Sequence, residues 1–273
     1  MSGVVTLTLR APPAAPLDAD VVAPDRLGTL SAREIAALPV WMGARVAPLG
    51  EFFHVAGERS DSVRIVGDLS RVHGMGTRMA GGTLVIDGDA GRGVGAEMRG
   101  GMTEVTGSVG DDAGVAMSGG TLRIRGNAGA RLGAALPGAA KGMTGGEIVI
   151  SGSAGPEAAA RARRGLVVVA GDVGERAARA MIAGTLVVLG RTAAHPGRQS
   201  KRGSIVAVGG IPVPATYQYA CTYRPAFVRF MMTYLRRRYE LAIDERVVGG
   251  SYRCFRGDAG DPGKGEILQW VAQ

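Results

Sequence analysis

Residues 83–101, TLVIDGDAGRGVGAEMRGG, combine a short apolar run with a glycine-rich stretch, as phosphate-binding loops do. In such loops the glycines let backbone N–H groups approach a phosphate, and a helix follows. Residues 102–120, MTEVTGSVGDDAGVAMSGG, repeat the pattern after nineteen residues, and TLRIRG follows at 121–126. A nucleotide loop occurs once, and neither G-x-G-x-x-G nor G-x-x-x-x-G-K-[ST] is present. The glycines therefore indicate a repeat rather than a nucleotide site.

One glycine of this pattern recurs eight times, at spacings of 21, 19, 19, 26, 19, 19 and 19 residues. A residue with a role in every repeat has an architectural role. We predict that these glycines are structural, because the chain turns where a Cβ would clash. They are Gly67, Gly88, Gly107, Gly126, Gly152, Gly171, Gly190 and Gly209.

Other residues that could do chemistry are sparse. His54, His73 and His195 each lack a second His or Cys at ligand spacing, so no metal site is predicted. The pair Asp111–Asp112 falls at a corner of the repeat and is expected to solvate a turn. No Ser-His-Asp or Cys-His arrangement emerges, so no catalytic residue is expected in this chain. The calcium-binding nonapeptide repeat fails on period and on missing aspartates.

The chain is basic: 32 Lys and Arg against 24 Asp and Glu give a formal charge of +8, and Lys occurs only at 141, 201 and 264. A basic run includes Arg179, Arg198, Lys201 and Arg202. Arg179 and Arg198 are one repeat apart, so stacked repeats would bring them within roughly 5 Å of each other. No aromatics interleave as in nucleic-acid sites. A bound anion, a partner's glutamates or plain solvation would each relieve the repulsion.

Bulk composition places the chain among folded, reduced proteins. Apolar residues make up 46% of 273, and the 45 glycines are periodic rather than low-complexity. Two cysteines, Cys221 and Cys254, form no disulfide framework. Neither a signal peptide nor a run of 18 apolar residues is visible. We expect a cytoplasmic protein that contacts no membrane.

Each repeat opens with a five-residue alternating segment, such as Leu84 and Ile86 or Leu122 and Ile124 on one face. Period two with β-branched residues predicts a strand with one buried face. Nineteen residues are too few for a β-α unit but suit one turn of a coil of short strands. Each repeat contains three short segments, and the third of them ends at a Met that is expected in the interior. These Met residues are Met79, Met98, Met117, Met143 and Met181.

The pattern predicts an all-β solenoid, a right-handed parallel β-helix of about seven to eight turns. Residues 62–210 form it, 1–61 are an N-terminal extension with a short helix, and 211–273 are a linker, an amphipathic helix and a tail. The insertion ALPGAAKGM at 135–143 keeps the register on both sides, so it is expected to bulge from a corner.

The outward strand positions become apolar in the later turns. A large exposed apolar patch marks a surface that something covers. We predict a partner interface there, the alternative being cover by the chain's own ends. Its residues are Val168, Val187, Leu189, Val206 and Val208.

Two helices are expected outside the repeats. Residues 31–38, SAREIAAL, carry a capping box of Ser31 and Glu34, and Pro39 follows. Residues 225–241 start with Pro and place Phe227, Phe230, Met231, Tyr234 and Leu235 on one side. That second helix is expected to cap the stack or to dock on a partner.

The repeat G-x-x-G-x-x-x-G ending M-x-G-G, seen at 88–101 and 107–120, resembles a β-helical repeat of two protein groups. One is the C-terminal domain of the glutamate synthase large subunit, and the other is the C subunit of formylmethanofuran dehydrogenase. Residues 30–57, LSAREIAALPVWMGARVAPLGEFFHVAG, are similar to the segment that precedes the β-helix in the C subunit. The resemblance covers about residues 25–240.

The resemblance implies a non-catalytic scaffold in one of two settings. In methylotrophic bacteria a formyltransferase/hydrolase complex passes a formyl group from tetrahydromethanopterin to a methanofuran-like carrier and releases formate. In methanogens a tungsten or molybdenum dehydrogenase fixes carbon dioxide onto methanofuran. The Arg- and Ala-rich composition favours the bacterial complex. A glutamate-synthase-like structural domain and a carbohydrate-active β-helix remain the alternatives.

The same resemblance implies partners and a ligand class. The implied partners are amidohydrolase-like, formyltransferase and dehydrogenase-B-like subunits. No nucleic acid is expected to bind. No cofactor is expected to bind tightly to this chain. Methanofuran-type carriers bear glutamate tails, so Arg179, Arg198, Lys201 and Arg202 are candidates to hold such a tail.

Overall fold

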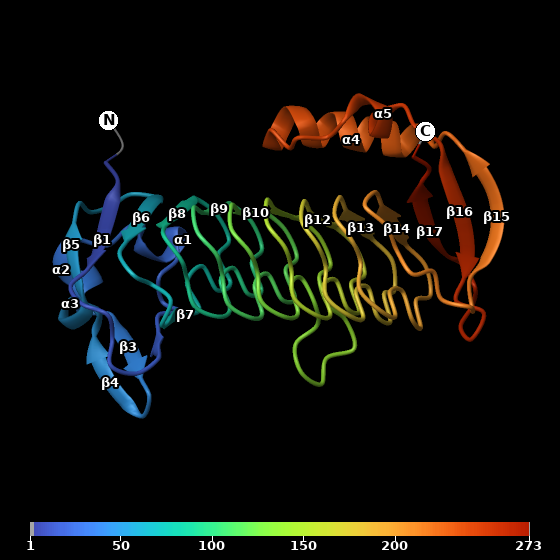
Figure 1. The fold of residues 1–273 in the computed structure, drawn as a ribbon. Coiled ribbons are helices and arrows are strands. Elements are labelled where there is room, and N and C mark those ends of the chain that lie inside the picture. Colours follow the sequence, from blue (N-terminus) through green and yellow to red (C-terminus); the bar gives the residue numbers. More distant parts are fainter. Residues whose placement is uncertain (1–2, 273) are drawn as a thin grey trace.

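The computed structural model describes residues 3–272, which are mostly β-structure with few helices (Figure 1). A mixed sheet of 13 strands has the order β15-β16-β17-β14-β13-β12-β11-β10-β9-β8-β6-β1-β5. Its middle strands come one from each repeat. They are β6 (Ser62–Val66), β8 (Thr83–Asp87), β9 (Met102–Val105), β10 (Thr121–Ile124), β11 (Glu147–Ile150), β12 (Leu166–Val169), β13 (Thr185–Val188) and β14 (Ser204–Ala207).

Successive repeats lie parallel and in register, one coil beside the next. Val168 of β12 is opposite Val187 of β13, which is opposite Val206 of β14. Leu122 pairs with Ile148 across the insertion, so the longer repeat keeps the register. A second row of parallel bridges runs from Leu69–Ala90 to Val173–Thr192. Equivalent residues of neighbouring coils are therefore stacked along the molecule.

The interior of the stack follows the alternating pattern. Leu122 and Ile124 of β10 are fully buried, as are their equivalents in the other coils. The predicted interior position of the Met column is confirmed, with Met79 and Met98 fully buried. Thr103 is the polar exception, and its hydroxyl donates to the sulfurs of those two residues at 3.5 and 3.8 Å. The Met column thus serves both to fill space and to satisfy a buried hydroxyl.

The strand-closing glycines sit where adjacent coils approach most closely. Gly67 and Gly88 have φ of +138° and +115°. Gly107 does not have a positive φ, but a Cβ on it would lie 2.6 Å from the Gly88 carbonyl oxygen. The constraint from Gly107 onward is therefore space between coils rather than backbone conformation. Their structural role stays a prediction until it is measured.

The N-terminal extension closes one end of the stack. Strand β1 (Val5–Leu9) lies parallel to β6, and β5 (Phe53–Ala56) pairs antiparallel with β1. A second sheet has the order β4 (Arg45–Pro48), β3 (Pro39–Met42), β2 (Leu17–Asp18) and β7 (Val72–His73). The helices here are α1 (Pro24–Leu27), α2 (Ala32–Ala36) and α3 (Leu49–Phe52). The predicted capping box is confirmed in α2, where Glu34 accepts from the Ser31 backbone N–H at 2.8 Å.

The C-terminal segment closes the other end and then returns over the stack. Strand β17 (Gly265–Trp270) lies parallel to β14, and β16 (Tyr252–Gly257) and β15 (Gln218–Tyr223) continue antiparallel. Cys221 and Cys254 are opposite each other in β15 and β16 as free thiols. Helix α4 (Ala226–Tyr239) and α5 (Glu245–Val248) lie along the strand side of the stack, and the insertion projects from the opposite side (Figure 1).

The apolar face of the later strands is covered by this segment, so the predicted partner interface is wrong. Val168, Val187 and Val206 are fully buried within the chain. They pack in one cluster with Val149 of β11 and with apolar residues of the C-terminal segment: Val228, Met232, Leu235, Tyr239, Leu241, Ile243, Val247, Val248, Tyr252, Cys254 and Leu268. Leu189 and Val208 are half-buried against the same cluster. The chain itself covers this valine column, which was the alternative to a partner.

The face of α4 that packs inward also differs from the prediction. Val228, Met232, Leu235 and Tyr239 are buried. Phe227, Phe230 and Tyr234 are exposed, whereas Leu235 of the predicted face is buried and Met231 is half-buried against the same cluster. The helix carries two apolar stripes, and the stripe with Val228, Met232 and Leu235 packs on the valine surface.

Polar contacts hold the C-terminal end of α4 to the sheet. Glu147 at the start of β11 accepts from the Tyr234 hydroxyl at 2.9 Å and from the Tyr239 hydroxyl. Burial, followed by the hydrogen bond to Glu147, raises the pKa of Tyr239, so its hydroxyl stays a donor at neutral pH. Arg123 of β10 donates to the Tyr239 carbonyl at 3.1 Å.

Replacing Gly107 by Val tests the close approach of coils. The new side chain would meet the backbone of Gly88 and the Asp89 carboxylate, so we expect unfolding free energy to fall by about 1–3 kcal/mol. Gly81 has no atom within 4 Å of a built Cβ, and Gly81→Val is the matched control. Chemical denaturation measures both, and equal midpoints would contradict the assignment.

Leu235→Ala tests the cover over the valine column. Leu235 is fully buried, so the truncation should lower the unfolding free energy by about 2–5 kcal/mol. Phe230→Ala removes a larger side chain from the exposed stripe of the same helix and should change stability by less than about 0.5 kcal/mol. A larger loss from Phe230→Ala in thermal melts would mean that the two faces are assigned the wrong way round.

Candidate functional site

In each coil, the stretch that follows the second row of bridges contains an equivalent residue in the left-handed backbone conformation. These residues form a row along the stack. In the first two coils the residue is glycine, and in the later coils it is charged or histidine. The row is Gly74, Gly93, Asp112, Arg131, Glu157, Arg176 and His195, with φ of 72°, 75°, 65°, 61°, 62°, 59° and 61°. We call the four charged members, Asp112 to Arg176, the ionic row.

The ionic row occupies positions where glycine is the least costly residue. A side chain in this conformation costs about 1–2 kcal/mol per residue relative to the right-handed one. Glycine fills the same position at 74 and 93, so the fold itself does not demand a side chain there. The coils also hold alanine in this conformation, for example Ala159 and Ala178, so the row is distinguished by its charged side chains rather than by its backbone.

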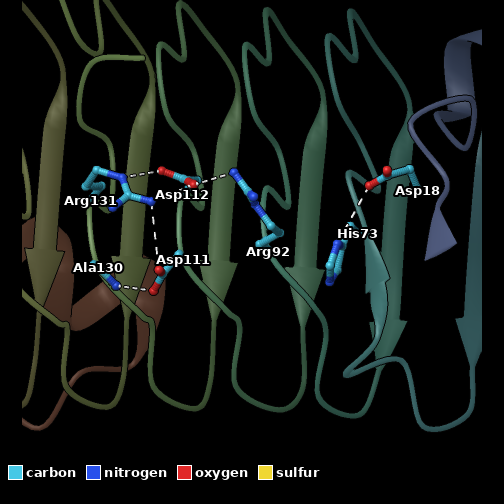
Figure 2. Close-up of polar contacts among 7 residues, drawn as sticks. All are labelled: Asp18, His73, Arg92, Asp111, Asp112, Ala130 and Arg131. Carbon is cyan, nitrogen blue, oxygen red and sulfur yellow. Dashed lines mark hydrogen bonds and ion pairs between the residues drawn. The ribbon is translucent and has the colours of Figure 1, made fainter. Parts of the chain in front are cut away.

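Asp112 is the centre of the first half of the row (Figure 2). Arg131 binds it through two contacts, Nε to Oδ1 at 2.6 Å and Nη2 to Oδ2 at 2.8 Å. Arg92, one coil earlier, donates to Oδ2 at 3.1 Å. The Asp112 side chain is 10% exposed, so its charge is compensated by two guanidinium groups rather than by water. The hydrogen bond to Asp112 raises the pKa of Arg131 above its ordinary value.

Asp111 has a different task, although it is adjacent in the chain. Its Oδ1 accepts from the Ala130 backbone N–H of the next coil at 2.8 Å. The expectation that the aspartate pair merely solvates a turn is wrong for Asp112, which is buried between two arginines. Asp111 is thus engaged by the next coil, and Asp112 by Arg92 and Arg131.

His73 and Asp18 extend the polar contacts toward the N-terminal lobe (Figure 2). The His73 Nδ1 lies 3.7 Å from the Asp18 carboxylate. Burial lowers the pKa of His73, Asp18 partly opposes this, and Arg92 adds to it. The imidazole is therefore neutral at pH 7, and the contact is an ion pair only in acid.

Glu157 is the centre of the second half. Its Oε1 lies 3.4 Å from Arg176 Nε and 3.2 Å from Arg179 Nε. The second contact has the distance of an ion pair but not the geometry of a hydrogen bond. Within residues 3–272, the buried Nε of Arg179 therefore has a counter-charge but no hydrogen-bond acceptor.

The insertion at 135–142 lies against the ionic row and separates two pockets. One, of about 230 Å³, is lined by Asp18, His73, Arg92 and Asp112 on the coils and by Leu136 and Pro137 on the loop. The other, of about 300 Å³, is lined by Arg131, Glu157, Arg161 and Arg179 and by loop residues 135–139. Arg161 holds the loop by donating to the Ala139 carbonyl at 2.8 Å. The larger pocket combines three guanidinium groups with one carboxylate, so it favours an anion.

The four predicted anion-binding residues do not converge. Arg179 faces the larger pocket, whereas Arg198, Lys201 and Arg202 are exposed and do not line it. The Ala180 backbone N–H donates to the Arg198 carbonyl, so the two coils are adjacent as expected. Sequence reasoning missed Arg131 and Glu157. An alignment of the repeats that included the stretch after the second row of bridges, and not only the strands, would have shown the alternating charges at 112, 131, 157 and 176.

Two further observations concern metal ligands and membrane-spanning helices. Within residues 3–272, no three His, Cys, Asp or Glu side chains are grouped as metal ligands would be. In the same range, every helix is too short or too polar to cross a lipid bilayer.

Comparison with known proteins identifies relatives at two levels. No family model matches the chain. The C subunit of the molybdenum-containing formylmethanofuran dehydrogenase 1 of Methanosarcina barkeri is 42% identical over 80 residues. The C subunit of the tungsten-containing formylmethanofuran dehydrogenase 2 of Methanothermobacter thermautotrophicus is 32% identical over 90 residues. The first match spans 28% of this chain and 27% of that relative, and the second spans 31% of this chain and 33% of that relative. The chain therefore matches about a third of either relative or less.

A solved structure matches over the whole length. A chain of the formyltransferase/hydrolase complex from Methylorubrum extorquens, crystallised in complex with methylofuran, superimposes with a TM-score of 0.90. It is 34% identical, and the match covers 98% of this chain and 100% of that one. This chain belongs to the C-subunit family of these complexes. The predicted membership of this family is thereby confirmed.

Arg176→Gly and Arg176→Ala separate the effect of losing the charge at position 176 from the cost of its left-handed backbone conformation. Glycine removes the charge and relaxes the backbone, whereas alanine removes the charge and keeps the unfavourable φ. The exposed ion pair contributes about 0–1 kcal/mol, so Arg176→Gly should be at least as stable as the wild type. Arg176→Ala should be about 1 kcal/mol less stable than Arg176→Gly. Equal melting temperatures for the two variants would contradict the backbone assignment.

Proposed function

We propose that this chain is the non-catalytic scaffold subunit of a formyltransferase/hydrolase complex. The complex converts formyl-tetrahydromethanopterin to formate through a methanofuran-like carrier. The observation that carries the proposal is the full-length match, TM-score 0.90 at 34% identity, to a chain of such a complex. Methanogenic dehydrogenase subunits match over less than a third of this chain, so a dehydrogenase setting is the second candidate.

The scaffold role is supported by how the charged side chains of the site are used. Asp112 is bound by two arginines, Asp111 caps the next coil, and Glu157 lies between Arg176 and Arg179. The histidine of the site, His73, has no serine, cysteine or second histidine among the residues that line its pocket. Such a set positions and neutralises charge, which fits a scaffold.

The proposal includes a right-handed parallel β-helix over residues 62–210, flanked by extensions at 1–61 and 211–273. Two observations support it: parallel pairing in one register from β6 to β14, and a second row of bridges from Leu69 to Thr192. The partners are the amidohydrolase-like, formyltransferase and dehydrogenase-B-like subunits, which supply the chemistry.

The anionic tail of the carrier is the ligand that we propose for the basic side of the stack. The larger pocket offers Arg131, Arg161 and Arg179, and one guanidinium N–H there lacks a hydrogen-bond acceptor within residues 3–272. Arg198, Lys201 and Arg202 lie on the exposed surface of the following coils and would extend the contact along a polyanion. Charge attraction of this kind is screened by salt.

The scaffold role is tested by isolating the chain from its own cells. A tag on the chain, gentle lysis and mass spectrometry should recover the three partner subunits in constant proportion. Recovery of tungsten- or molybdenum-dependent dehydrogenase subunits would support the second candidate. Recovery of the chain alone, at native expression levels, would overturn both.

The carrier contact is tested on the assembled complex. Arg161→Ala with Arg179→Ala should weaken binding of a glutamate-tailed carrier by about tenfold or more, and wild-type affinity should fall as salt rises. Arg33→Ala with Arg59→Ala removes two exposed arginines away from the pocket and is the control for total charge. Unchanged affinity in the double variant, with the complex intact, would remove the larger pocket from the carrier path.

A further inference from the structure

Helix α4 leaves one of its two apolar stripes in solvent. Phe230 is 75% exposed, Phe227 44% and Tyr234 41%. Their spacing of three and four residues places them on one side of the helix. The opposite stripe already covers the valine column, so the exposed aromatics add nothing to that core. Aromatic side chains are enriched where one protein binds another, and an exposed stripe of them on a folded chain indicates such a surface.

A groove of about 600 Å³ lies beside this stripe. Its walls are Arg224 just before α4, Arg229 and Phe230 within α4, and the stretch from Val248 at the end of α5 to Gly250. Both charged residues of the lining are arginines. Neither forms an ion pair with any residue in the range 3–272, whereas Arg236, further along α4, is paired with Glu245. The groove therefore presents an apolar wall and two uncompensated positive charges.

We propose that this groove, with Phe227 and Phe230, is the docking surface for an acidic segment of another subunit of the complex. An apolar side chain of that segment lies between Phe230 and Val248, and its carboxylates pair with Arg224 and Arg229. Charge complementarity selects this occupant, since an aromatic wall between unpaired arginines matches an apolar residue flanked by Asp or Glu. The inference rests on the proposed function, because the partner is one of the subunits that function requires.

The shape of the surface favours a protein over a lipid membrane. A helix that binds a bilayer surface turns its wide apolar face outward. In α4 the wide face of Val228, Met232 and Leu235 is turned inward, and Tyr234 is held by Glu147. What remains is a narrow stripe beside a concave groove, which fits a side chain of a partner.

The test uses the assembled complex and two variants of the full chain. Phe230→Glu and Arg229→Glu place negative charge opposite the expected carboxylates. Each should weaken the affinity of the chain for its partner subunits at least about tenfold. Trp41→Glu and Arg33→Glu are the matched controls, since both residues are exposed at the far end of the molecule. All four variants should melt as the wild type does when isolated.

A photo-crosslinking residue at position 226, which lines the groove and is exposed, identifies what lies in the groove. The expected product joins the chain to an Asp- or Glu-containing peptide of a co-purified partner. If the wild type co-purifies with its partners but Phe230→Glu binds as tightly, the docking surface is wrong and the scaffold role stands. If the wild type does not co-purify, the scaffold role fails first. Binding to phosphatidylglycerol-containing vesicles that Phe230→Glu abolishes, without a crosslink to any partner, would overturn the proposal in favour of a membrane.

Discussion

The backbone hydrogen bonds between adjacent coils impose the constraint on which the rest of the structure depends. They hold equivalent residues of each nineteen-residue repeat at the spacing of neighbouring strands, about 4.8 Å. Equivalent residues of successive coils therefore form a column. A residue fits at a given position only if it can pack against the equivalent residues of the two adjacent coils. Glycine is required where backbones nearly touch, as at Gly107 over Gly88. Apolar residues stack without conflict, and the columns at Leu122 and Ile124 run through the interior.

Charge is the property that such stacking tolerates least, and the ionic row shows how the chain handles it. Like charges in one column would lie within a few ångströms of each other. Along the row the sign alternates from Asp112 to Arg131 to Glu157 to Arg176, so each charge has a counter-ion one coil away. The insertion at 135–142 falls between the second and third members, and the pocket that it walls retains an excess of guanidinium groups. The disturbance of the repeat and the departure from charge balance coincide there.

Much of this arrangement could be predicted from the sequence, because a repeat exposes its own rules. Strand positions, the Met column and the capping box at Ser31 follow from local periodicity and need no tertiary information. The cover of the valine column does not follow, since it depends on where a segment distant in the sequence folds back. Helix periodicity shows that α4 has apolar stripes but not which one meets Val187. The ionic row was hidden for another reason: left-handed conformations carry no hydropathy signal, and only the alignment of Asp112 with Gly93 and Gly74 indicates one.

The two ends of the stack face the same physical problem and solve it differently. An open parallel ladder exposes unpaired backbone groups, which invite association with other chains. Both ends are extended by antiparallel strands, β5 on β1 and β16 and β15 beyond β17, which leaves β5 and β15 as the edges of the sheet. At the C-terminal end the closing segment also returns over the sheet, because the valine column needs cover. That return leaves helix α4 on the surface with Phe230 and Arg229 outward. The surface that we assign to a partner is therefore a consequence of the way in which the chain buries its own apolar face.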